Sequence, residues 1–101
     1  MATTTDLGWL WEVLVDRRER GDVDASYTSR LLAAGPDRIA QKVGEEAVET
    51  IIASQRVQRG AGPEELVGEA ADLTYHLLVL LLAHGLTPAD VARELERRHA
   101  S

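Results

Sequence analysis

The sequence predicts an all-α protein, a helical bundle of about four to five helices. Three observations favour this class. Apolar residues recur at helical spacing, Gly and Pro fall where helices would end or begin, and no segment alternates between apolar and polar residues as a half-buried strand would. With 101 residues, we expect a single domain over residues 1–101, with residues 1–6 frayed.

The first helix is predicted by an apolar stripe that repeats every three or four residues. Its members are Leu7, Leu10, Trp11 and Leu14. The stripe favours a helix over residues 7–20 that ends at Gly21, a residue type typical of helix C-termini. Residues 21–25 have the composition of a loop.

A short helix and a long one are predicted next. Ser26 and Thr28 are both suitable N-caps, and they indicate a short helix near residues 29–34. Pro36 suits the first turn of a new helix, which we expect to continue to about residue 57. Its helical spacing is carried by Ile39, Val43, Ala47, Thr50 and Ile51.

The second half of the chain predicts two more helices. Residues 58–62 contain two glycines and form a turn, after which residues 63–84 make a long helix that begins with a proline. The segment from Thr87 resembles a capping box and starts a last helix over residues 88–98. We expect this helix to turn Val91 and Leu95 inward.

The acidic residues are unevenly placed. Seven of the 17 lie between Glu45 and Asp72. Glu46 and Glu49 are three residues apart, as are Glu69 and Asp72, so each pair lies on one helix face. The predicted turn between the two helices would make them antiparallel and bring the pairs to the same level. Four facing carboxylates form an oxygen-ligand site for a hard divalent cation such as Mg²⁺.

An acidic helix face is more often simply solvated, and this alternative must be weighed. The helix over residues 63–84 argues against it, because leucines cover nearly every direction around its axis, which is typical of a buried helix. Glu69 and Asp72 would then be enclosed and would need a proton, a basic partner or a metal. Lys42 is the single lysine, on the same face as Glu46, and one cation cannot offset four acids.

Composition excludes several classes of function. The net charge of −6 argues against a surface that binds nucleic acid through its phosphates. The absence of cysteine excludes thiolate metal sites and cysteine nucleophiles. The longest apolar run, residues 77–83, is far shorter than the about 20 residues of a membrane span, and the first residues do not resemble a signal peptide. We therefore expect a cytoplasmic protein that binds neither nucleic acid nor membrane.

Several segments together carry a resemblance to a known family. They are Ser-Tyr-Thr-Ser-Arg-Leu at 26–31, Ile-Ala-Gln-Lys-Val-Gly-Glu-Glu-Ala-Val-Glu at 39–49, Glu-Ala-Ala-Asp-Leu-Thr-Tyr-His-Leu-Leu-Val at 69–79 and the tail at 85–98. The acidic pattern resembles the all-α nucleoside-triphosphate pyrophosphohydrolase (MazG-like) superfamily. Within it, the chain is similar to the phosphoribosyl-ATP pyrophosphohydrolase family of histidine biosynthesis over residues 7–98.

The resemblance implies hydrolysis of phosphoribosyl-ATP to phosphoribosyl-AMP and pyrophosphate. Mg²⁺, with Mn²⁺ as the alternative, would be held by four acids: Glu46, Glu49, Glu69 and Asp72. Glu45 would orient the attacking water or complete the shell of a second cation, so Glu45 and Glu46 are the candidate catalytic residues. Some relatives carry a cyclohydrolase domain with cysteine ligands; this chain lacks the cysteines and the length, so only the pyrophosphohydrolase step is expected.

Substrate contacts are expected from Lys42, which would contact a phosphate or balance the acids, and from the start of the short helix. The candidates there are Ser26, Thr28 and Arg30, although helix capping alone also accounts for the two hydroxyls. His76 is either a substrate contact or a packed histidine bonded to a neighbouring carboxylate.

Two alternatives to this function stay open: a pyrophosphohydrolase of the same fold that acts on a dNTP or dUTP, and a non-enzymatic helical dimerisation module. We also expect a homodimer, because a small bundle cannot bury leucines on every face of one helix. The resemblance points the same way, with both subunits lining each active site.

Overall fold

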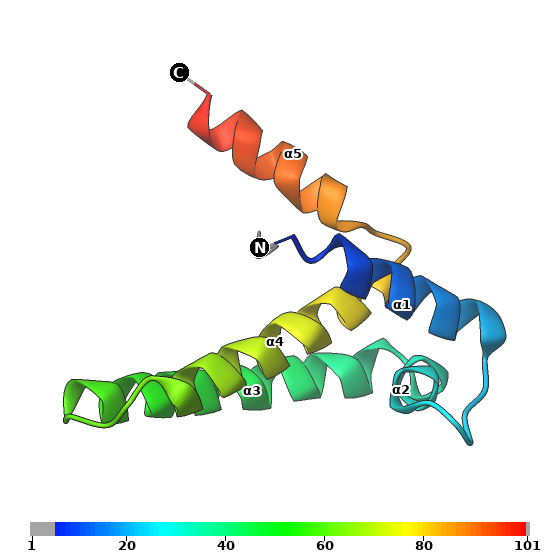
Figure 1. Cartoon of the computed structure of the whole chain (residues 1–101). Coiled ribbons are helices and arrows are strands. Elements are labelled where there is room, and N and C mark those ends of the chain that lie inside the picture. Colours follow the sequence, from blue (N-terminus) through cyan, green and yellow to red (C-terminus); the bar gives the residue numbers. More distant parts are fainter. Residues whose placement is uncertain (1–5, 101) are drawn as a thin grey trace, which may run out of the picture.

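The computed structural model describes residues 6–100 and contains five helices (Figure 1). They are α1 (Gly8–Arg20), α2 (Tyr27–Ala34), α3 (Pro36–Gln58), α4 (Glu64–Ala83) and α5 (Pro88–His99). Residues 6–100 form no strand, so the predicted all-α class is confirmed. Each helix lies within one or two residues of its predicted bounds. The expected fraying falls mostly on residues 1–5, which lie outside the described part.

Local sequence explains where these helices begin and end. Ser26 has extended backbone angles and its Oγ accepts a hydrogen bond from the Ser29 N–H at 3.1 Å, so α2 begins two residues earlier than predicted. Thr87 and Asp90 form the predicted capping box of α5, each side chain accepting from the other's backbone N–H. Gly21 ends α1 with a φ of 60°, a left-handed angle that glycine adopts without strain.

The long helices α3 and α4 form an antiparallel pair, and α1 and α2 pack at one end of it (Figure 1). The apolar core lies at that end, where α1 and α2 meet the start of α3 and the last turns of α4. Its buried members are Leu14, Leu31, Ile39, Val79 and Leu82. The other end of the helix pair, with the α3–α4 turn, extends away from this core.

Helix α5 leaves the body of the chain (Figure 1) and contributes no buried residue. The prediction that Val91 and Leu95 point inward is wrong for the single chain, because both are exposed, at 43% and 51%. The radius of gyration of 15.5 Å also exceeds the about 13 Å of a compact domain of this length. The chain is therefore more open than a self-contained bundle.

Helix α4 is apolar on nearly every side but only partly covered. Its buried residues are His76, Val79 and Leu82, whereas Leu77 is 45% exposed. The expectation of a helix buried all round is thus wrong for one chain, because α3 covers one side along its length and α1 and α2 cover only its last turns. By length and composition α4 would suffice to cross a membrane, since an 18-residue window has a mean hydropathy of 1.5 and is 17% buried. A single helix of this kind is weak evidence for a membrane span.

Candidate active site

Three carboxylates meet where α3 and α4 pack together. Glu46 and Glu49 from α3 and Glu69 from α4 each offer one oxygen, and these oxygens lie within 4.8 Å of one another. We call these three residues the acidic trio. Glu46 is buried, Glu69 is half-buried and Glu49 is exposed. The spacing of three residues on α3 and the turn before α4 thus bring the acids together as the sequence predicts.

The acidic trio holds a proton near neutrality. The pKa of Glu69 rises from 4.5 to about 7, chiefly through the hydrogen-bonding contact with the Glu49 carboxyl, then through desolvation and the neighbouring negative charges. Glu69 Oε2 is buried without a hydrogen-bond partner when both acids are ionised. A proton shared with Glu49 or a bound cation would satisfy this oxygen.

Glu46 lies deepest in the trio. Burial is the main cause that raises the pKa of its carboxyl, and the charges of Glu49 and Asp72 raise it further. Positive charge on His76 or Lys42 lowers the pKa of Glu46. The interior of the site is therefore short of positive charge, as the sequence predicts.

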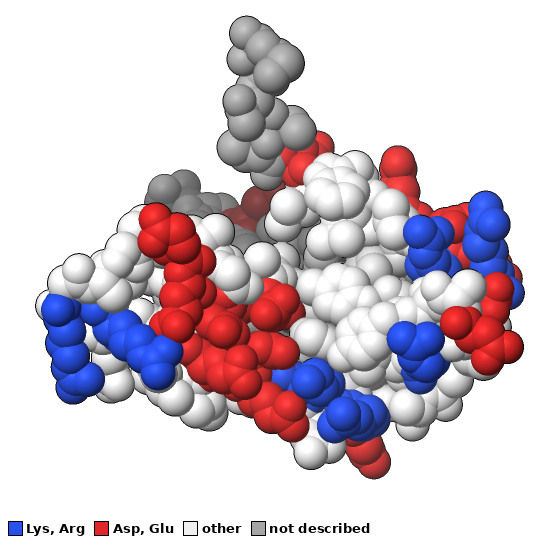
Figure 2. All heavy atoms as spheres, turned by 60° about the horizontal axis from the view of Figure 1, so that its bottom comes forward, with Lys and Arg blue, Asp and Glu red and all other residues white. Residues whose placement is uncertain are grey.

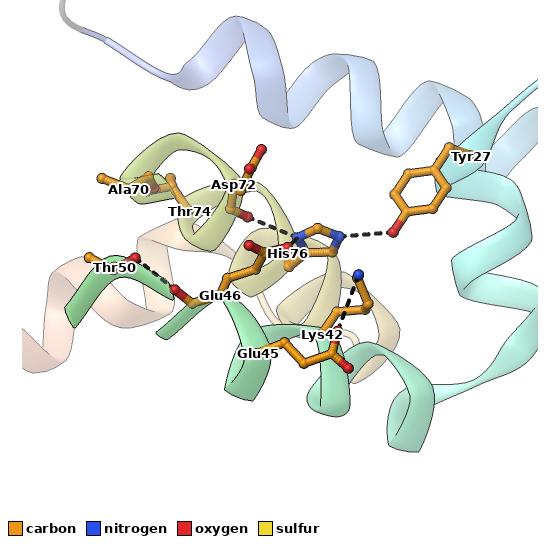
Figure 3. Close-up of polar contacts among 9 residues, drawn as sticks. All are labelled: Tyr27, Lys42, Glu45, Glu46, Thr50, Ala70, Asp72, Thr74 and His76. Atoms are coloured by element: carbon orange, nitrogen blue, oxygen red, sulfur yellow. Dashed lines mark hydrogen bonds and ion pairs between the residues drawn. The ribbon is translucent and has the colours of Figure 1, made fainter. Parts of the chain in front are cut away.

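Asp72 lies beside the trio but outside it. Its side chain is exposed, and Figure 3 shows its carboxylate directed away from Glu46. Its charge nevertheless raises the pKa of both Glu46 and Glu69. The expected enclosure of Asp72 is wrong for the single chain, in which this face of α4 is uncovered. Its place as a fourth ligand stays a prediction.

Lys42 lies one turn before Glu46 on α3, and Glu45 directly precedes Glu46. Lys42 Nζ donates to Glu45 Oε1 at 3.4 Å, and this contact is the main cause that raises the pKa of the lysine. The negative charge of Glu46 also raises the pKa of Lys42, and Figure 3 shows the lysine ammonium directed toward the side on which Tyr27 and His76 lie. Lys42 is thus placed at the edge of the trio, where an anionic group would meet it.

His76 is buried at 6% exposure, and both of its ring nitrogens are engaged. Nδ1 lies 2.9 Å from the backbone oxygen of Asp72, and Nε2 lies 3.0 Å from the Tyr27 hydroxyl. Glu46 Oε1 is 3.7 Å from Nδ1, an ion pair only when the ring is charged. His76 therefore joins α4 to α2, with its Nδ1 hydrogen bond to a backbone oxygen rather than to a carboxylate. Its role as a substrate contact stays a prediction.

The candidate residues of α2 have structural partners. Ser26 caps the helix, as described above, whereas Thr28 is not a cap: its buried hydroxyl bonds the Tyr75 hydroxyl. The Arg30 guanidinium donates to the Val23 carbonyl at 3.0 Å. Their roles toward a substrate stay predictions.

Sequence reasoning assigned no role to Tyr27, although it lies between two candidate residues in the quoted Ser-Tyr-Thr segment. Its ring is stacked on that of Tyr75, with centroids 6.1 Å apart and planes at 21°. The signal available in the sequence was its position between the two candidate contacts Ser26 and Thr28.

The charges on this face are segregated. Figure 2 shows the acidic side chains in a band across the face formed by α3 and α4, with basic side chains on both sides of it. Three clustered carboxylates and a nearby fourth are a ligand set that suits hard divalent cations. Such a cation would allow an acidic protein to bind an anionic substrate.

The chain matches a known family over nearly its full described length. The sequence profile of phosphoribosyl-ATP pyrophosphohydrolase matches residues 10–99. A protein of Burkholderia cenocepacia (strain HI2424) named phosphoribosyl-ATP pyrophosphatase is 51% identical over 85 residues, which cover 84% of this chain and 70% of that protein. One of the same name from Burkholderia mallei (strain SAVP1) is 47% identical over 97 residues, 96% of this chain and 80% of that protein. The chain therefore belongs to the phosphoribosyl-ATP pyrophosphohydrolase family.

Proposed function

We propose that this chain hydrolyses the α–β phosphoanhydride of phosphoribosyl-ATP to give phosphoribosyl-AMP and pyrophosphate, the second step of histidine biosynthesis. The observation that carries the proposal is the acidic trio, formed by two helices within a stretch that matches the family from residue 10 to residue 99. We also propose that the enzyme works in the cytoplasm, where its nucleotide substrate would be found.

The acidic trio and Asp72 suit a divalent cation, for which we propose Mg²⁺ with Mn²⁺ as the alternative. The buried, unpartnered Glu69 Oε2 and the raised pKa values of Glu46 and Glu69 support this choice, because a bound cation would replace the protons that the cluster otherwise keeps. When bound, the cation would neutralise phosphate charge and lower the pKa of water.

The chain's own groups would position the triphosphate. Lys42 lies at the edge of the trio and would pair with a phosphate oxygen. Glu45 holds Lys42 through the 3.4 Å contact and is exposed to solvent, so it would orient a water or complete the shell of a second cation. Ser26 caps the adjacent α2 and Thr28 and Arg30 lie in its first turn, where the helix dipole favours anions, so these three residues stay candidate substrate contacts.

We further propose a homodimer that completes the site. The exposed apolar residues of α4 and α5, together with the large radius of gyration, support a second copy that covers them. In this proposal the apolar faces of α4 are covered by the second copy and not by a membrane. Light scattering at micromolar concentration is expected to give a mass of at least two chains, and a fully active monomer would overturn this part of the proposal.

The direct test is pyrophosphate release from phosphoribosyl-ATP against a panel of dNTPs and dUTP, with and without Mg²⁺. We expect release from phosphoribosyl-ATP only, and only with the cation. Glu69→Gln should abolish it, whereas Glu12→Gln, an exposed acid on α1 outside the trio, should not. Preference for a dNTP would favour the alternative pyrophosphohydrolase, and no hydrolysis of any nucleotide would favour a non-enzymatic dimerisation module.

A further inference from the structure

A chain of two hydrogen bonds runs from the backbone of α4 to the first residue of α2. The Asp72 carbonyl oxygen lies 2.9 Å from His76 Nδ1, and His76 Nε2 lies 3.0 Å from the Tyr27 hydroxyl (Figure 3). The imidazole is buried, so it exchanges neither partner for bulk water. Forty-nine positions separate Tyr27 from His76, and the contact therefore depends on the tertiary fold.

The Asp72 carbonyl fixes the direction of the first bond, and the direction of the second follows from it for the neutral ring. A carbonyl oxygen only accepts, so His76 Nδ1 carries the hydrogen and donates it to Asp72. In the neutral imidazole Nε2 then has a lone pair, and the Tyr27 hydroxyl donates to it. The only hydrogen of the phenol is used in this bond. Towards any further partner, the Tyr27 oxygen can act only as an acceptor.

The Tyr27 side chain is also held in place and reachable. Tyr75 stacks on its ring, and the Arg30 guanidinium lies 5.9 Å from the ring centroid. Tyr27 remains 44% exposed. Its hydroxyl lies on the far side of the His76 ring from Glu46, and Lys42 points toward the same region (Figure 3). The phenol oxygen is thus an oriented acceptor that the His76 ring separates from Glu46, on the side to which Lys42 points (Figure 3).

We propose that Tyr27 determines specificity for a ribonucleotide by accepting a hydrogen bond from a hydroxyl of the ribose that carries the triphosphate. Phosphate oxygens are acceptors and cannot pair with this oxygen. The ribose hydroxyls are donors, and the ribose follows directly after the α-phosphate that would lie at the trio. His76 is a positioning residue that acts through Tyr27. This inference rests on the proposed function.

The test compares Tyr27→Phe with Tyr75→Phe, which also removes one phenol hydroxyl from the stacked pair. Each protein is assayed with phosphoribosyl-ATP and with its 2′-deoxy and 3′-deoxy analogues. The wild type is expected to lose about tenfold in kcat/KM on the analogue that lacks the contacted hydroxyl, the net worth of one neutral hydrogen bond. Tyr27→Phe should lose about the same factor in kcat/KM on phosphoribosyl-ATP itself. It should show no further loss in kcat/KM on that deoxy analogue. Tyr75→Phe should discriminate as the wild type does.

Calorimetric binding of the product phosphoribosyl-AMP and its two deoxy forms supplies a readout without turnover, and the same pattern is expected in Kd. If the wild type hydrolyses phosphoribosyl-ATP but Tyr27→Phe still discriminates against both deoxy forms as the wild type does, the inference about Tyr27 is overturned and the proposed function stands. If the wild type neither hydrolyses phosphoribosyl-ATP nor binds its product, both are overturned.

Two substitutions of His76 separate positioning from a merely structural tie. The longer Gln side chain of His76→Gln places its amide at the position of Nε2 and keeps an acceptor for Tyr27 but no donor at Nδ1. The shorter Asn side chain of His76→Asn places its amide at the position of Nδ1 and keeps the donor to Asp72 but no acceptor at Nε2. If His76 acts through Tyr27, His76→Asn loses discrimination against the deoxy substrate and His76→Gln retains it. The opposite order, or equal loss of thermal stability with discrimination intact in both, would refute the positioning role.

Discussion

Binding of a cation to the acidic trio should release protons, and the amount follows from the structure. With a pKa of about 7, Glu69 in the metal-free protein is about half protonated at pH 7, about 90% at pH 6 and about 10% at pH 8. A cation that binds the ionised carboxylate must displace this proton. We therefore expect release of about 0.5 proton per chain at pH 7, rising to about 0.9 at pH 6 and falling to about 0.1 at pH 8.

Calorimetric titration of Mg²⁺ or Mn²⁺ in two buffers of different ionisation enthalpy measures this number, because the difference in heat reports the protons that the buffer takes up. Glu69→Gln should remove most of the release at pH 7, whereas Glu12→Gln should leave it unchanged. Binding without proton release at pH 7, or equal release from wild type and Glu69→Gln, would refute the reading of the trio as a proton-holding cation site.

The same pKa sets the pH dependence of stability. The folded-state pKa of Glu69 lies above its ordinary value of 4.5. The contribution of its proton to the free energy of unfolding is therefore fully present below pH 4.5 and is lost as the pH rises through about 7. The part of the Tm that depends on Glu69 should therefore fall across this window in the metal-free protein. Saturating Mg²⁺ should restore it most strongly at the upper end, where the carboxylates are ionised. The difference in Tm with and without Mg²⁺ at pH 5 and pH 8 tests the sign.

Three further outcomes are expected. Asp72→Asn should lose activity while the metal-free Tm is kept or rises, because one repelling charge is removed from Glu46 and Glu69; near-normal turnover would argue against Asp72 as a ligand. Lys42→Met should raise the KM for substrate while metal affinity, measured by calorimetry, stays the same or increases; small, equal effects on both would make Lys42 a surface residue. Thr87→Ala removes the α5 N-cap, worth about 1 kcal/mol, so the first-turn amides of α5 should exchange about fivefold faster; unchanged exchange would mean that the cap does not hold this helix.

Helix positions and the acidic trio were predictable because both depend on short-range rules. Ser26 and Thr87 cap their helices through contacts three residues away, and a spacing of three residues places Glu46 and Glu49 on one face. The turn before α4 then brings Glu69 opposite them. No long-range information was needed for these features beyond the antiparallel packing of two consecutive helices.

Features set by long-range packing were not predictable. The bond between Tyr27 and His76 joins residues 49 positions apart, and no local pattern indicates it. The direction of α5 depends on the loop that leaves α4 and on what covers its apolar face, so Val91 and Leu95 were wrongly expected inside. Asp72 shares the face of Glu69 by spacing, but its side chain is one methylene shorter, and it lies outside the trio.

The exposed position of Asp72 and the open shape of the chain have a common explanation in the proposed homodimer. Leucines on several faces of α4 would be an aggregation liability in a free monomer, and a second copy that packs on them would also cover the side of α4 that leaves Asp72 exposed. Covering it would desolvate its carboxylate beside Glu46 and Glu69 and make a proton or cation there more necessary. Dimer formation and cation binding should therefore be linked: Mg²⁺ should tighten self-association, and dilution to monomer should weaken Mg²⁺ binding by the same factor. Sedimentation equilibrium with and without Mg²⁺ measures this coupling, and identical dimer dissociation constants in both conditions would show that Asp72 and the trio are complete within one chain.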